Sequence, residues 1–105
     1  MKKLLLILLF FPMISSAQDS GIYINEYMSR NTSSFQDEDG EYTDWIEIYN
    51  GGKKSIELLN YTISDDAKNP SKWTFPSVII RPNGHLLIFA SEKDRLTGDY
   101  LHTNF

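Results

Sequence analysis

Carboxylates are the residues best suited to chemistry in this chain, and they crowd into one short stretch. Five of them fall within the eight positions 37–44, at Asp37, Glu38, Asp39, Glu41 and Asp44. Calcium takes about six to eight oxygen ligands in a flexible geometry, and carboxylates are its usual side-chain ligands. The set Asp37, Asp39, Glu41 and Asp44 is therefore a candidate calcium site.

The same stretch also has a simpler interpretation. Counting from Asp37 puts Gly40 at position four and Ile48 at position twelve, whereas the helical calcium loop needs glycine at six and glutamate at twelve. A solvated acidic loop would keep the end of a strand soluble and discourage pairing at a sheet edge. The sequence leaves both interpretations open.

The chain contains no motif that indicates catalysis. It has no cysteine, no Gly-x-Ser-x-Gly turn, no His-Glu-x-x-His pair and no glycine-rich phosphate loop. The only histidines, His85 and His102, have no evident partner in the sequence, and the adjacent Asp65 and Asp66 would point to opposite sides of a strand end. We therefore predict no catalytic residue and no bound organic cofactor.

The aromatic residues allow two interpretations as well. Exposed, they would form a platform for carbohydrate; buried, they would supply the core of a small domain without disulfides. We expect core packing for most of them and a central core position for Trp73. The residues concerned are Trp45, Tyr49, Tyr61, Trp73 and Phe75.

The amino-terminal end has the pattern of a secretory signal peptide. Lys2 and Lys3 precede the apolar run 4–11, and Ser15 and Ala17 place small side chains before a cleavage point. A membrane-spanning helix needs roughly 20 apolar residues, and Pro12 interrupts this run early. We predict a signal peptide over residues 1–17, a domain over residues 18–105, no stable membrane span, and a secreted, periplasmic or extracellular location.

The charge balance argues against nucleic acid as a direct ligand. The formal net charge is −4, and it becomes −6 once Lys2 and Lys3 are removed with the leader. An acidic protein with scattered basic residues repels phosphate backbones. Because no cysteine is present, the exported domain must depend on its hydrophobic core.

Short strands separated by turns are predicted along the rest of the chain. The segments expected to be strands are 22–27, 43–50, 55–59, 60–64, 72–75, 78–80 and 85–90. Alternation in the second segment places Ile46 and Ile48 on the core face and Trp45 on the opposite one. The turn at 50–53 favours a hairpin between 44–49 and 55–59. This spacing predicts an all-β sandwich.

Seven short motifs follow one another in an order that resembles the lamin tail domain, especially in its secreted bacterial branch. They are the segments 24–26, 37–40, 44–50, 64–66, 72–76, 82–84 and 101–105. The resemblance implies an immunoglobulin-like β-sandwich. Members usually continue past the last motif into further strands, so we expect the domain to be incomplete at its carboxyl-terminal end.

The resemblance also implies a role. Lamin tail domains are accessory modules, so we expect a secreted, non-catalytic domain that binds or positions a protein, a cell-surface ligand or a covalently linked neighbouring domain. One alternative is the amino-terminal accessory part of a larger secreted nuclease, phosphatase or spore-coat-protein-H-like kinase. Another is a calcium-stabilised carbohydrate or cell-surface adhesion module.

Overall fold

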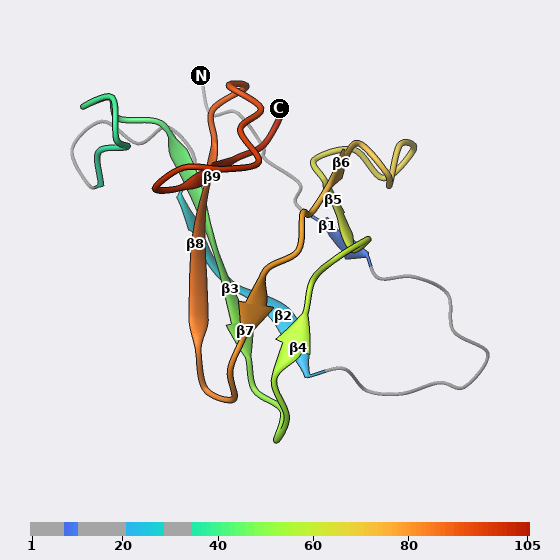
Figure 1. The fold of residues 1–105 in the computed structure, drawn as a ribbon. Coiled ribbons are helices and arrows are strands. Elements are labelled where there is room, and N and C mark those ends of the chain that lie inside the picture. Colours follow the sequence, from blue (N-terminus) through green and yellow to red (C-terminus); the bar gives the residue numbers. More distant parts are fainter. Residues whose placement is uncertain (1–7, 11–20, 29–34) are drawn as a thin grey trace.

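A computed structural model describes residues 8–10, 21–28 and 35–105. These residues form strands and turns and no helix. The strands assemble into sheets of four, three and two strands (Figure 1). The predicted cleavage point after Ala17 lies outside the described residues.

The four-stranded sheet has the order β2-β3-β8-β9. Its strands are β2 (Ile22–Met28), β3 (Asp44–Asn50), β8 (His85–Ala90) and β9 (Leu101–His102). The β2–β3 and β3–β8 pairs are antiparallel, and β9 lies parallel to β8. A β-bulge between Ile24 and Glu26 shifts the register of β2 against β3.

Two smaller sheets face this one. The strands β1 (Leu8–Phe10), β5 (Thr62–Ser64) and β6 (Trp73–Thr74) pair in the order β1-β5-β6. The strands β4 (Ile56–Glu57) and β7 (Ile79–Ile80) pair with each other. All of these strands are only two or three residues long, so packing between the sheets must supply much of the stability.

The core fills the space between the sheets. Its buried side chains come from both layers, which is the arrangement of a β-sandwich. They are Ile46, Ile48, Leu58, Ile63, Trp73, Phe75, Ile80 and Ile88. The predicted core positions of Ile46, Ile48 and Trp73 are thus confirmed.

The opposite face of the four-stranded sheet carries a second buried layer. Trp45 is 4% exposed although it points away from Ile46 and Ile48. Phe35 packs edge-to-face on Trp45 with 5.3 Å between ring centroids, and His102 stacks on the neighbouring Phe89 at 5.4 Å. Burial of Trp45, Trp73 and Phe75 favours packing over a carbohydrate platform for these three, while Tyr49 and Tyr61 are half-buried.

The predicted hairpin between residues 44–49 and 55–59 is wrong. Both edges of β3 are already occupied, by β2 and β8, and β4 pairs with β7 in the other layer. The buried Asn50 side chain donates to the carbonyls of Lys54 and Ile80 at 2.8 Å each and accepts from the Gly52 N–H at 2.9 Å. These bonds carry the chain after β3 across to the facing layer.

In the part of the chain that the structure describes, there is no helix long and apolar enough to cross a membrane.

Candidate functional site

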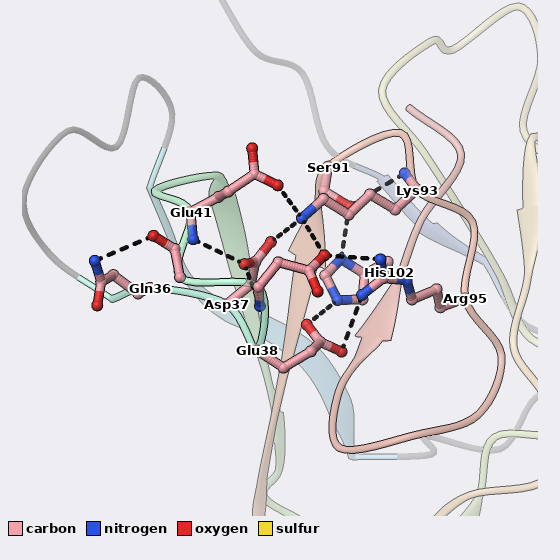
Figure 2. A network of polar contacts seen from close by, with 10 residues as sticks. Gln36, Asp37, Glu38, Glu41, Ser91, Lys93, Arg95 and His102 are labelled. Carbon is pink, nitrogen blue, oxygen red and sulfur yellow. Dashed lines mark hydrogen bonds and ion pairs between the residues drawn. The ribbon is translucent and has the colours of Figure 1, made fainter.

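Two segments that are far apart in sequence meet at one end of the four-stranded sheet. Asp44 at the start of β3 lies opposite Ala90 at the end of β8. Because the strands are antiparallel, the loop that enters β3 and the segment that leaves β8 emerge side by side. Figure 2 shows the result: the acidic loop 36–41 faces the segment 91–95 and His102 of β9.

Asp37 organises the acidic loop. Its Oδ1 accepts the backbone N–H groups of Asp39 and Glu41 at 3.0 Å each, which closes the turn from the side chain. Its carbonyl accepts the Gly40 N–H at 2.9 Å, and Gly40 has φ 76°, a conformation that glycine adopts without strain. The Asp37 side chain is fully buried, so its charge needs a partner.

Lys93 supplies that partner. Its ammonium Nζ lies 2.5 Å from Asp37 Oδ2, 2.8 Å from Asp39 Oδ2 and 2.8 Å from Glu41 Oε1. The three N–H bonds of an ammonium match three carboxylate oxygens, so every donor of Lys93 is used. The Lys93 side chain is itself only 18% exposed, which strengthens these contacts relative to a surface ion pair.

A second row of contacts extends the network. Arg95 binds Asp39 at 2.7 Å through Nη2 and Glu38 at 3.5 Å through Nη1. Glu38 Oε1 lies 2.5 Å from His102 Nε2, and Ser91 Oγ lies 2.6 Å from His102 Nδ1. The His102 ring is fully buried. Together these contacts hold the acidic loop against β9 and the segment that follows β8.

The contacts displace the pKa values of the acids. Burial raises the pKa of Asp37, but hydrogen bonds from Lys93 and from backbone N–H groups outweigh it, and the net change is downward. The pKa of Glu38 is lowered in the same way, by hydrogen bonds and by the nearby His102 and Arg95. Hydrogen bonds from Arg95 and Lys93 lower the pKa of Asp39 to about 2.

The basic side of the network responds in the opposite direction. Burial lowers the pKa of Lys93, yet its hydrogen bonds to Asp37, Asp39 and Glu41 raise the net value above the ordinary one. The pKa of Arg95 is raised chiefly by its hydrogen bond to Asp39. The groups whose pKa values are shifted in these directions are therefore charged at neutral pH: Asp37, Glu38, Asp39, Lys93 and Arg95.

The structure brings together three of the four predicted calcium ligands. Asp37, Asp39 and Glu41 each offer an oxygen, and these oxygens lie within 4.8 Å of one another. Asp44 is not part of this group or of the other such group in the described residues, which joins Asp37 and Glu38 to His102. Lys93 Nζ binds the three oxygens directly, so a cation at this point would compete with the lysine.

Ser91, His102 and Glu38 form a row of the residue types found in hydrolases. The two ring nitrogens of His102 contact different neighbours, Nε2 the Glu38 carboxylate and Nδ1 the Ser91 hydroxyl. Ser91 Oγ also accepts the Lys93 backbone N–H at 3.2 Å. A nucleophile's base must take up a proton next to bound substrate, whereas this ring lies buried against Phe89. The row fits a structural role.

Sequence reasoning missed the basic half of the site. Lys93 and Arg95 are two positions apart, and so are successive acids at 37, 39 and 41. This matching spacing of opposite charges was a signal in the sequence. The two halves are separated by 52 to 56 residues, however, and only the pairing of β3 with β8 brings them together. His102 looked isolated for the same reason.

A family model for the Lamin Tail Domain matches residues 15–105. The chain belongs to this family. The match confirms the resemblance seen in the sequence and, with the sheets described above, the immunoglobulin-like all-β fold of this lamin tail domain. The lamin tail domain is itself a non-catalytic fold. No curated protein and no solved structure matches the chain.

Replacing Lys93 with methionine tests how much the domain depends on this network. The change keeps the apolar stem but leaves the buried Asp37 carboxylate without its cation. Removing one partner of a buried ion pair costs roughly 3 to 5 kcal/mol. We expect the free energy of unfolding of Lys93→Met, measured by urea denaturation, to fall by about 3 kcal/mol or more.

Lys72→Met is the matched control. Lys72 binds Asp65 at 2.9 Å, but the two side chains are 33% and 23% exposed. Such a pair contributes about 1 kcal/mol or less. Equal losses in the two lysine variants would show that Lys93 is an ordinary surface residue.

The lowered acid pKa values predict a loss of stability in acid. A carboxylate whose folded pKa is below its unfolded value of about 4 stabilises the fold above that pH. This stabilisation disappears as the pH falls through the folded pKa, which for Asp39 is about 2. We expect the urea midpoint to change little from pH 7 to 5 and to drop between about pH 4 and 2. A flat midpoint down to pH 2 would contradict the network, and Lys93→Met should show a shallower drop.

Proposed function

We propose that this lamin tail domain is a secreted, non-catalytic module that binds or positions a neighbouring protein. The signal-peptide pattern of residues 1–17 supports export, and the acidic net charge argues against direct contact with nucleic acid. Membership of the family supports an accessory role. The runner-up is the accessory part of a larger bacterial secreted enzyme, such as a nuclease, phosphatase or kinase, whose chemistry is encoded elsewhere.

One observation carries the non-catalytic part of this proposal. The residues of the described chain that could do chemistry at this end of the sheet are bonded to one another. Lys93 uses its ammonium protons on three carboxylates, and His102 lies fully buried between Ser91 and Glu38. A catalytic base needs contact with substrate, so the network supports a scaffold that holds two loops in a fixed arrangement.

Export and inactivity can be measured on the same material. When the full chain is produced with its own leader, we expect the exported protein to begin at Gln18, as determined by intact mass and amino-terminal sequencing. We expect no hydrolysis of p-nitrophenyl acetate, p-nitrophenyl phosphate or DNA above the buffer rate. A folded, membrane-held product that retains residues 1–17 would contradict export.

Ser91→Ala is the control for catalysis. It removes only the hydroxyl that contacts His102 Nδ1. If the wild-type protein hydrolysed an ester and Ser91→Ala did not, the row of Ser91, His102 and Glu38 would be catalytic and the proposed function would be wrong. Equal background rates in both proteins support the structural role.

We propose calcium stabilisation of the acidic loop, as part of an adhesion module, as a second candidate. The clustering of Asp37, Asp39 and Glu41 oxygens favours it, and the Lys93 ammonium opposes it by occupying the same point. A cation that binds only the folded state at a hundred times its dissociation constant adds about 2.7 kcal/mol. That gain is the quantity to look for.

Melting curves in calcium and in chelator decide this candidate. If calcium displaces Lys93 in the native protein, the wild-type melting temperature should rise in millimolar calcium, and the rise should disappear in the Asp37→Asn, Asp39→Asn double variant. If the lysine holds the site, calcium should stabilise only Lys93→Met, in which the three carboxylates have lost their cation. Magnesium is the control, because it demands a tighter octahedral geometry.

A further inference from the structure

The strand β1 belongs to the predicted leader, yet it is paired with the domain. Leu8, Leu9 and Phe10 lie antiparallel to Ser64, Ile63 and Thr62 of β5. Figure 1 shows β1 beside β5, and the strand order β1-β5-β6 makes β1 an outer strand of the three-stranded sheet. If export removes residues 1–17, this strand leaves, and β5 becomes the edge of the sheet.

The backbone of β5 is arranged to receive a strand at that edge. Across the other side of β5, the Phe75 N–H donates to the Tyr61 carbonyl at 2.8 Å. Alternate residues of a strand direct their backbone groups to opposite neighbours. The Tyr61 carbonyl and the backbone groups of Ile63 are therefore directed toward β6. Thr62 and Ser64 direct their N–H and C=O groups toward β1.

The same edge has an apolar floor. With β1 in place, Ile63 is fully buried, and it joins Trp73 in the core. An edge that combines unpaired backbone groups with apolar side chains attracts another strand, and this is the basis of recognition by strand addition. An open β5 edge is thus a binding site by its chemistry.

We propose that the exported protein uses the β5 edge to bind an extended, apolar strand of a partner protein, and that Leu8–Phe10 of the leader fills this edge before processing. This inference rests on the proposed function, since it names the partner class of a secreted binding module. The occupant seen in the structure is apolar at all three positions. The β5 segment itself is Thr-Ile-Ser, so an apolar partner strand fits the edge better than a second copy of β5 does.

The leader-retaining full chain gives the sharpest test. The probe is a fluorescent peptide with the sequence of residues 2–11 followed by three lysines for solubility, and the readout is fluorescence anisotropy. A tethered strand competes at a millimolar effective concentration, so the leader-retaining chain should bind the peptide at least tenfold more weakly than the exported, processed protein. The variant Phe10→Pro of the leader-retaining chain should bind like the processed protein, because proline removes the Phe10 N–H that faces Thr62 across the β1–β5 pairing.

Two controls separate strand addition from non-specific adhesion. The peptide carrying the same Phe10→Pro change should not bind. Thr62→Pro in the processed protein removes an N–H that faces the edge and should weaken binding at least tenfold. Its melting curve shows whether it is folded, and if it is not, the peptide control and the leader variant still decide the question.

Several outcomes would overturn the inference. Three results would each exclude an acceptor edge at β5. They are equal binding by the leader-retaining chain, its proline variant and the processed protein; equal binding of the proline peptide; and no binding of the peptide to any of these proteins. A processed protein that dimerises and excludes the peptide would assign the edge to a second copy. If export leaves the leader attached, the proposed secretion fails, while the Phe10→Pro variant, which needs no processing, still tests the edge.

Discussion

The contact between the Lys93 ammonium and the buried Asp37 carboxylate is the interaction on which this end of the domain depends. It joins the loop before β3 to the segment after β8, and Arg95 and His102 extend the connection to Asp39 and Glu38. A buried carboxylate is costly unless it is paired and hydrogen-bonded, and Asp37 has both kinds of partner. The loop therefore has one favourable position, over the outer face of the four-stranded sheet.

This position explains the second buried layer. Trp45 and Phe89 lie on the face of the sheet that points away from the sandwich core, where solvent would normally reach them. Phe35, which precedes the acidic loop in sequence, packs on Trp45. His102, which belongs to the charged network, stacks on Phe89. Charge pairing supports aromatic packing at this end, because the ion pair between His102 and Glu38 holds the His102 ring beside Phe89.

The functional proposals follow from how the polar groups are used. At the charged end, the ammonium, guanidinium, imidazole and carboxylate groups bind one another, so their polar atoms are used in contacts within the domain. At the β5 edge, the backbone groups of Thr62 and Ser64 are directed toward β1, which pairs with them. The first region suits a rigid scaffold, and the second suits recognition by strand addition.

Local sequence determined the elements of this protein. Period-two alternation identified β3 and its core residues Ile46 and Ile48, and the ordered motifs identified the family. Only the tertiary structure decided the partners. The turn after Asn50 favours a hairpin locally, yet β3 pairs with β2 and β8, because side-chain bonds from Asn50 direct the chain into the other layer. Lys93 meets Asp37 across 56 residues of sequence, since ion pairing between distant residues depends on strand order, and strand order is set by packing of the whole sandwich.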